Sequence, residues 1–337
     1  MHKCLTIMGL SFLVFSCSAQ KNSTNRNIET KPKPITTATE KIVEKKHEVV
    51  SYKGVEFFKN NIGDITKNDN TTSYGSIVTA EPKGFKVVKT YFPSLAQNFR
   101  QKYIILHYTA IDDDKSILAL TQRGVSAHYL VNDKEDNQIY QLVDENKRAY
   151  HAGLSVWRND KNLNDNSIGI EITNMGYTVD SIGKKVFAPF NENQLKKVFK
   201  LVKDIADRYQ IPPTNILGHS DVAPTRKQDP GPMFPWKKLY EEEKIGMWYD
   251  DATMKNVMMK SLSTFDSMKD KNTFIFKVQS DLQNFGYDIV PTGSWNTENM
   301  RVVESFQYRF RPENYDGVLD LGTYSILQAL LQKYPGK

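Results

Sequence analysis

Cysteine is almost absent from this chain of 337 residues, since the only two, Cys4 and Cys17, lie near its start. The rest of the chain therefore lacks the thiols that a disulfide framework or a thiolate metal site requires. Any metal held by the folded part must be bound by histidine and carboxylate. A dense basic block is also missing, because the 45 basic and 39 acidic residues are spread along the chain and leave a net charge of +6. This distribution predicts no nucleic-acid partner.

The start of the chain carries an apolar run, Leu5 to Phe15, that follows a lysine. The run has the length of the apolar region of a secretory signal and is too short to span a bilayer, which takes about 20 apolar residues. Val14-Phe15-Ser16-Cys17 closes the run and is similar to the lipobox of bacterial lipoproteins. We therefore expect residues 1–16 to be a signal peptide and Cys17 to carry lipid. The alternative is an ordinary signal peptide with an incidental cysteine.

The composition of the chain divides the remainder into a tether and two folded domains. Asparagine, threonine, lysine, glutamate and proline dominate the stretch up to about residue 50, and such a segment cannot bury a core. We expect residues 17–50 to form the lipidated cysteine and a flexible tether. The first domain is predicted at 51–245, with its core at 100–236, and the second at 262–337. The sequence assigns no role to residues 51–98.

Apolar, β-favouring runs alternate with helical patterns through the first domain. The runs are Tyr103–Leu106, Ala127–Val131, Ile139–Val143, Ile168–Ile172 and Asn215–Gly218. The clearest helical pattern starts at Asn191, whose side chain can cap the first turn, and ends before Ile211. This alternation predicts an α/β fold with a mixed central sheet and flanking helices.

The second domain shows three stretches with helical spacing of apolar residues, at Phe274 to Phe285, Glu298 to Phe310 and Gly322 to Tyr334. They predict a small C-terminal three-helix domain.

Two histidines follow apolar runs: His107 comes directly after the first, and His219 comes directly after the last. Side chains at strand ends of an α/β sheet can meet at one edge, where ligand sites collect. Asp229 follows in a loop rich in proline and glycine, which can bring a carboxylate back to that edge. Two histidines and a carboxylate with an open fourth position are typical of one catalytic Zn²⁺ per chain. Chance spacing of these residue types remains the alternative.

Glu171 lies between Ile170 and Ile172 in an apolar run, where a carboxylate is out of place unless it is needed. If the side chain is buried, its pKa rises toward the range of a general base. The alternative is an ordinary alternating strand with Glu171 on its solvent face.

Several short motifs occur in a fixed order and together are highly specific. They are Leu106-His107-Tyr108-Thr109-Ala110, Ser126-Ala127-His128-Tyr129-Leu130, Tyr150-His151-Ala152-Gly153, Ser167-Ile168-Gly169-Ile170-Glu171, Gly218-His219-Ser220-Asp221-Val222-Ala223-Pro224 and Arg226-Lys227-Gln228-Asp229-Pro230-Gly231-Pro232. The series resembles the zinc-dependent N-acetylmuramoyl-L-alanine amidase family, which has the peptidoglycan-recognition-protein fold, and most of all its lipoprotein branch. Ser305-Phe306-Gln307 and Asp316-Gly317-Val318 are similar to the peptidoglycan-binding domain of the same branch.

The resemblance implies roles for particular side chains. The family's metal ligands fall on His107, His219 and Asp229, its catalytic glutamate on Glu171 and its active-site lysine on Lys227. Three further side chains either line the substrate groove or belong to the scaffold, and these are His128, His151 and Trp157.

The activity implied by the resemblance is hydrolysis of the amide between the lactyl group of N-acetylmuramic acid and L-alanine of the stem peptide. Peptidoglycan or its muropeptides are the implied partners, and the lipid on Cys17 would hold a monomer at the periplasmic face of the outer membrane. Two other functions stay open at this point: a module that binds peptidoglycan without cutting it, and a lipoprotein that only anchors the wall. The C-terminal domain either binds the wall or stabilises the first domain by packing.

Overall fold

The computed structural model describes residues 48–52, 55–59, 80, 82–87 and 98–336. The predicted signal peptide, Cys17 and most of the tether lie outside these residues. Of the two compact units, 1–46 and 47–337, only the second is described here. None of the helices in the described ranges combines the length and the apolar character that a bilayer span requires.

A five-stranded sheet in the order β11-β3-β8-β4-β5 forms the centre of the fold. Its strands are β11 (Ile216–Gly218), β3 (Tyr103–Tyr108), β8 (Ser167–Ile172), β4 (Tyr129–Val131) and β5 (Tyr140–Gln141). The first four run parallel and β5 pairs antiparallel with β4, which confirms the predicted mixed sheet. Strands β3 and β8 lie in the middle and are almost wholly buried, as their continuous apolar runs require. The edge strands are shorter than the sequence predicted.

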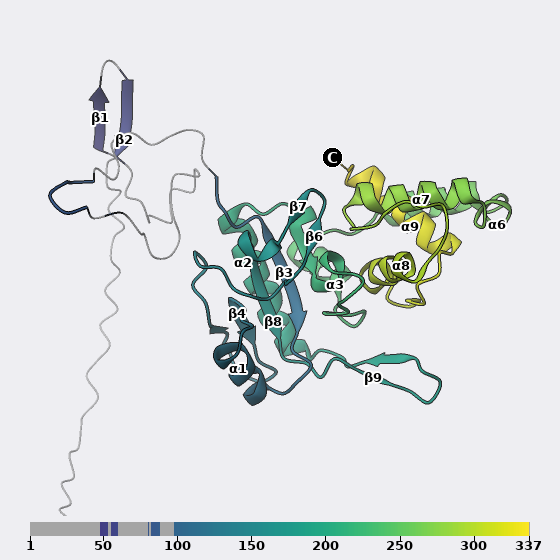
Figure 1. Ribbon diagram of the computed structural model, residues 1–337, viewed down its shortest axis with the longest axis horizontal. Helices are drawn as coiled ribbons and strands as arrows, with labels where there is room; N and C mark the ends of the chain where they lie inside the picture. Colours follow the sequence, from purple (N-terminus) through teal and green to yellow (C-terminus); the bar gives the residue numbers. More distant parts are fainter. Residues whose placement is uncertain (1–47, 53–54, 60–79, 81, 88–97, 337) are drawn as a thin grey trace, which may run out of the picture. The chain divides into compact units, whose positions relative to one another are not determined.

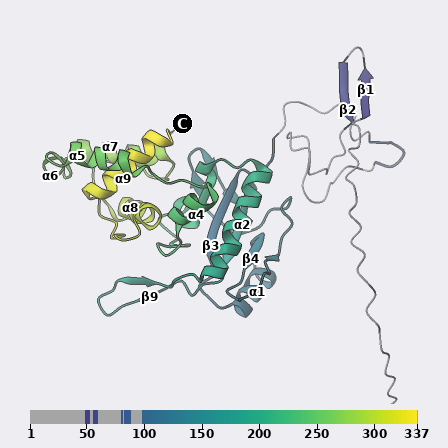
Figure 2. The same cartoon turned by 180° about the vertical axis from the view of Figure 1, so that it is seen from behind.

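Helix α2 (Glu192–Tyr209) covers one face of this sheet, and Figure 2 shows it in front of β3. The Asn191 side chain caps the helix by accepting from the backbone N–H of Gln194. Its apolar stripe is buried in the core. Shorter helices border the sheet, and these are α1 (Asp113–Gln122), α3 (His219–Val222) and α4 (Trp236–Glu243).

Three two-stranded hairpins complete the β structure of the described residues. The first pairs β1 (Glu48–Tyr52) with β2 (Val55–Lys59), the second β6 (Val156–Trp157) with β7 (Asp160–Lys161), and the third β9 (Tyr177–Val179) with β10 (Lys185–Phe187). The third hairpin projects from the sheet in Figure 1, and the Lys185 ammonium on it lies 3.0 Å from the Glu304 carboxylate in the helical part.

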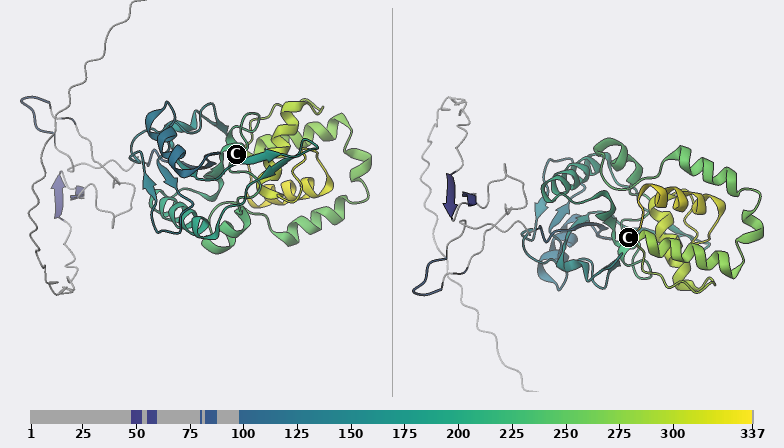
Figure 3. Two further views of the ribbon diagram at one scale, coloured as in Figure 1. Left: turned by 90° about the horizontal axis from the view of Figure 1, so that it is seen from below. Right: turned by 90° about the horizontal axis from the view of Figure 1, so that it is seen from above.

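The C-terminal part is helical, as predicted, and contains more than three helices. They are α5 (Asp251–Ser261), α6 (Phe265–Met268), α7 (Asn272–Phe285), α8 (Thr297–Phe310) and α9 (Leu321–Lys333). Both views in Figure 3 place these helices beside the sheet. One apolar core runs through both parts, from Ile104 in β3 to Phe306 in α8. The helical part is therefore packed against the sheet as part of one compact unit.

Candidate metal centre

The register of the sheet brings two histidines to one edge. Gly218 of β11 pairs with Leu106 of β3, so His219 and His107 each come one residue after that pair. Asp229 reaches the same place because its backbone carbonyl accepts from the N–H of Ser220, at 2.8 Å. The three candidate ligands therefore meet at the carboxyl end of parallel strands, where α/β sheets place their sites.

The candidate ligand atoms form a small triangle. His107 Nδ1 and His219 Nδ1 lie 2.9 Å apart, and each lies 2.9 Å from Asp229 Oδ2. All three side chains are buried. Among the residues that the structure describes, His107, His219 and Asp229 form a group of side chains with the spacing of a metal site.

The electrostatics of the triangle favour the protonation states in which these groups bind a cation. Burial, and then the neighbouring His219, lowers the pKa of His107 to about 4, which keeps its imidazole neutral. Burial alone would raise the pKa of Asp229, but the two adjacent imidazoles hold it well below its usual range. The site thus offers neutral imidazole nitrogen and an ionised carboxylate.

The hydrogen bonds of His219 show that this donor set fits a metal. Its Nε2 lies 3.0 Å from the carbonyl oxygen of Ala152, which can only accept, so Nε2 carries the proton. Nδ1 of the neutral ring then carries a lone pair, and it lies 2.9 Å from Asp229 Oδ2. Two acceptors at this distance repel unless a cation lies between them. A Zn²⁺ ion with two imidazole nitrogens and one carboxylate oxygen matches that requirement.

Glu171 lies next to the triangle on β8, where it is the register partner of His107. Its side chain is half-buried, and among the described residues its Oε2 has no hydrogen-bond partner. Burial, and then the charge of Asp229, raises the pKa of Glu171 to about 8, while Lys227 opposes the shift. An alternating strand with Glu171 in solvent is therefore not what the structure contains.

Lys227 lies in the loop between His219 and Asp229, where its backbone N–H donates to the carbonyl of Ala223. The side chain is half-exposed. Its positive charge lowers the pKa of both Glu171 and His107, so the ammonium is within electrostatic range of both groups. The structure thus gathers all five side chains to which the resemblance gives metal or catalytic roles.

Of the two alternatives, groove or scaffold, the burial of His128, Trp157 and His151 favours the scaffold for all three. His128 is wholly buried, with Nδ1 accepting from the N–H of Gly169 and Nε2 3.0 Å from the carbonyl of Lys147. Trp157 is also wholly buried; its Nε1 donates to the carbonyl of Thr214 and its ring packs edge-on against Tyr287 of the helical part. Both are scaffold residues, because a side chain without exposed surface cannot line a groove.

His151 contacts His107 on the side of the ring that faces away from the triangle, and 9% of its surface is exposed. Its Nδ1 is 3.0 Å from His107 Nε2, and its Nε2 is 3.2 Å from Ser167 Oγ. Burial, and then the charges of neighbouring histidines, lowers its pKa well below the usual range. With both ring nitrogens occupied by protein partners, His151 supports His107 and does not face a groove.

Asp221 and its partners, which the sequence pattern does not indicate, stabilise the start of α3 at His219. Asp221 accepts from the N–H of Gly218 at 2.8 Å, from Arg309 Nη1 at 2.7 Å and from the Tyr287 hydroxyl at 2.7 Å. Arg309 and Asp221 are 2% and 1% exposed. Asp221 follows His219 by two residues in the chain, but Arg309 and Tyr287 come from the helical part, so these contacts leave no local pattern in the sequence.

Arg226 was missed as well. Its Nη2 donates to the carbonyls of Ala152 and Leu154, at 2.8 and 2.9 Å. It therefore fixes the segment whose Ala152 carbonyl orients the His219 ring.

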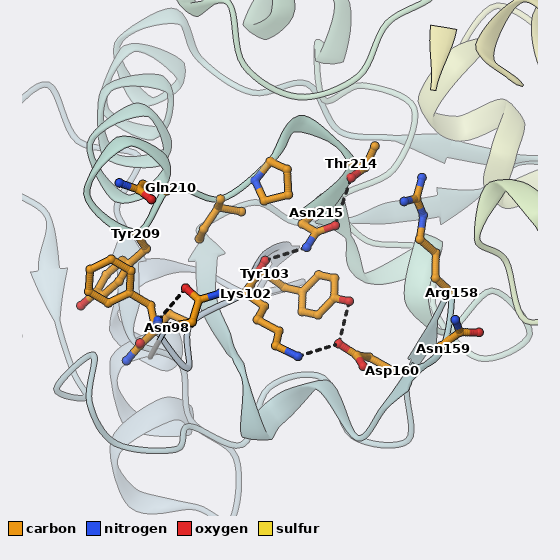
Figure 4. Close-up of a pocket in the computed structure, with 14 residues that line it drawn as sticks. Asn98, Lys102, Tyr103, Arg158, Asn159, Asp160, Tyr209, Gln210, Thr214 and Asn215 are labelled. Carbon is orange, nitrogen blue, oxygen red and sulfur yellow. Dashed lines mark hydrogen bonds and ion pairs between the residues drawn. The ribbon is translucent and has the colours of Figure 1, made fainter. Parts of the chain in front are cut away.

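A cavity of about 320 Å³ lies away from the triangle, at the opposite end of β3. Figure 4 shows Tyr103 and Lys102 pointing toward Asp160 there, at 2.9 and 3.6 Å. Tyr103 is four residues before His107, which in a strand is a separation of about 13 Å. Lys102 pairs with Asp160, whereas Arg158, which also lines the cavity, donates from Nε to the carbonyl of Phe285. None of the three candidate ligands lines this cavity, which is therefore separate from the candidate metal centre.

The region that contains the candidate ligands matches a known protein family. A family model described as N-acetylmuramoyl-L-alanine amidase matches residues 97–232, and one described as putative peptidoglycan binding domain matches residues 272–327. The amidase AmiD of Escherichia coli is 42% identical over 242 residues, which cover 70% of this chain and 84% of AmiD. The 1,6-anhydro-N-acetylmuramyl-L-alanine amidase AmpD of Enterobacter cloacae is 36% identical over 117 residues, 35% of this chain and 56% of AmpD.

Solved structures of amidases are also similar to this chain. The complex of E. coli AmiD with the substrate anhydro-N-acetylmuramic acid-L-Ala-D-gamma-Glu-L-Lys is similar with a TM-score of 0.67 and 38% identity, covering 76% of this chain and 98% of AmiD. AmpDh3 of Pseudomonas aeruginosa in complex with an anhydromuramic pentapeptide has a TM-score of 0.64 and 36% identity, covering 77% of this chain and all of AmpDh3.

Proposed function

Since the chain belongs to the N-acetylmuramoyl-L-alanine amidase family, we propose that it hydrolyses muropeptides with a zinc ion held by His107, His219 and Asp229. The observation that carries the zinc assignment is the buried triangle of two Nδ1 atoms and one carboxylate oxygen, each pair 2.9 Å apart. The bond cleaved is the amide between the lactyl group of N-acetylmuramic acid and L-alanine. AmiD and AmpDh3 bind anhydromuramic peptides, which supports the same substrate class here.

The residues around the triangle suit the steps of amide hydrolysis. A zinc ion bound there would supply a Lewis acid for the scissile carbonyl and would acidify the attacking water. Glu171, with its unpartnered buried Oε2, takes a proton from that water and delivers it to the leaving amino group of L-alanine. The ammonium of Lys227 stabilises the negative charge that develops on the carbonyl oxygen.

A binding module that does not cut peptidoglycan is the second candidate from the sequence. Such a module needs neither a complete ligand set nor a carboxylate with a raised pKa beside it. Both are present, with Glu171 in register with His107. These features favour the enzyme.

We expect the chain to release free stem peptides from an anhydromuramic tetrapeptide, and a chelator such as 1,10-phenanthroline to abolish the release. Added Zn²⁺ should restore it, because the ligand side chains remain in place without the ion. The products are identified by liquid chromatography and mass spectrometry. Binding of the muropeptide without cleavage in the presence of zinc would favour the binding module instead, and cleavage that resists the chelator would remove zinc from the proposal.

The sequence supports a lipid anchor on Cys17 and a position at the periplasmic face of the outer membrane, where a monomer on its tether would reach the wall. The match to a putative peptidoglycan binding domain supports wall binding by the helical part.

The anchor gives a direct prediction in a Gram-negative host. Blocking lipoprotein signal peptidase should shift the protein to a larger apparent mass on a gel, and Cys17→Ala should release it from the membrane fraction into the periplasm. The Cys4→Ala chain is the matched control and should behave as wild type. An unchanged band and unchanged fractionation in the Cys17→Ala chain would exclude lipidation at this position.

A further inference from the structure

A line of buried polar groups leads from His107 into the protein, away from Asp229. His107 Nε2 lies 3.0 Å from His151 Nδ1, and His151 Nε2 lies 3.2 Å from Ser167 Oγ. Ser167 Oγ in turn donates to the backbone carbonyl of Leu163. His107, His151 and Ser167 are 1%, 9% and 4% exposed, so water does not compete for these groups.

The carbonyl at the inner end of this line decides where each proton lies. A carbonyl oxygen only accepts, so the single hydroxyl proton of Ser167 is committed to Leu163. Ser167 Oγ must then accept from His151, which places the proton of the neutral His151 ring on Nε2. His151 Nδ1 is consequently an acceptor, and the proton of His107 lies on Nε2. His107 Nδ1 is left as a lone pair directed at His219 and Asp229.

The surrounding residues hold the His151 ring in this orientation. A side-chain carbon on Gly169 would lie 2.3 Å from His151 Cγ, so only glycine leaves room for the ring on β8. The backbone N–H groups of His151 and Ala152 both donate to Asn164 Oδ1, at 3.1 and 2.8 Å. The ring is therefore fixed both by packing and by its own backbone.

We propose that His151 and Ser167 are positioning residues that fix the metal-binding tautomer of His107. The inference deepens the proposed function and rests on the zinc ion assigned there. Without an acceptor at Nε2, the His107 proton would be favoured on Nδ1, 2.9 Å from the Asp229 carboxylate. A proton in that position occupies the lone pair that the metal needs. The two residues thus oppose the pull of Asp229 on the same ring.

The proposal is tested with two substitutions of similar size at one position. His151→Asn keeps an acceptor oxygen where histidine has Nδ1, whereas His151→Leu removes it. Loss of such a supporting group typically weakens metal binding by about 10- to 100-fold. We expect the Leu variant of the full chain to lose zinc affinity within that range and the Asn variant to recover most of it. Affinity is measured by competition with a chromophoric chelator, and circular dichroism checks the fold.

A second readout follows the tautomer directly and needs no metal. In the zinc-free chain labelled with ¹⁵N-histidine, two-bond ¹⁵N correlations should show the protons of His107 and His151 on Nε2. Ser167→Ala should remove the fixed pattern at His151. The six histidines are assigned by single substitutions.

Equal zinc affinity of the folded Leu and Asn variants would overturn the proposal, and so would a proton on Nδ1 of His107 in the zinc-free wild type. If a variant does not fold, the wild-type spectrum alone decides. A wild-type chain that binds no zinc would refute the proposed metal, and the spectrum would still test the tautomer.

Discussion

Replacing Glu171 with glutamine is expected to slow hydrolysis of an anhydromuramic peptide by roughly 10²- to 10⁴-fold, the usual contribution of a general acid–base group. Glutamine preserves the shape of the side chain on β8 but cannot take a proton from water. Because Glu171 contributes no atom to the triangle of candidate ligands, the zinc content should stay at one ion per chain. Turnover is measured by chromatography of released stem peptides, and zinc by atomic emission on the same sample.

His219→Ala is the control for this variant, since it removes a ligand and should abolish both zinc binding and turnover. The pair separates chemistry from metal binding. Full turnover in the Glu171→Gln chain would exclude Glu171 as the proton carrier. Loss of zinc from that chain would instead indicate that the carboxylate helps to hold the metal.

Replacing Arg309 with methionine is expected to lower the free energy of unfolding by about 3 to 5 kcal/mol, the usual cost of removing one partner from a buried ion pair. Asp221, which is 1% exposed, would lose the guanidinium that lies 2.7 Å away. The Ile216 carbonyl would lose its bond from Arg309 Nη2 as well. Urea unfolding followed by circular dichroism measures the change.

Lys238→Met provides a matched control, because Lys238 pairs with Glu192 at 2.6 Å while both side chains are well exposed. Exposed pairs contribute about 1 kcal/mol or less, so this variant should unfold close to the wild type. Adding Asp221→Asn to Arg309→Met should recover part of the loss, since the unpaired charge is then removed. A loss below about 1 kcal/mol in the Arg309→Met chain would show that Asp221 is compensated in another way.

The parts of the fold that the sequence predicts are those whose signals are local. The central strands β3 and β8 are continuous apolar runs, and α2 has an amphipathic stripe with a capping asparagine, so each is recognised from its own residues. Helix α5 lies outside the stretches predicted to be helical, and its residues are at most half-buried, so its apolar signal is weak. Strand β5, at one edge of the sheet, spans only two residues and pairs with β4 alone.

The same distinction applies to the site. His107 near the end of β3 and His219 directly after β11 were recognisable as candidates, as were Asp229 and Glu171, and the ordered motifs added Lys227. The burial of Trp157 depends on Tyr287 and Phe285, more than 100 residues later in the sequence. The tautomer of His107 depends on a carbonyl at Leu163 that is reached through two other side chains. Neither relation leaves a pattern in the local sequence.

The contacts of Asp221 with Arg309 and Tyr287 limit how the two parts of this chain can be recombined with parts of other proteins. Joining the sheet part of this chain to a helical part from elsewhere would leave the buried carboxylate beside His219 without its arginine and its hydroxyl. We expect recombination to succeed only when the incoming part supplies both groups or when Asp221 changes with it. The boundary between the two matched regions is therefore not a neutral place to cut this chain.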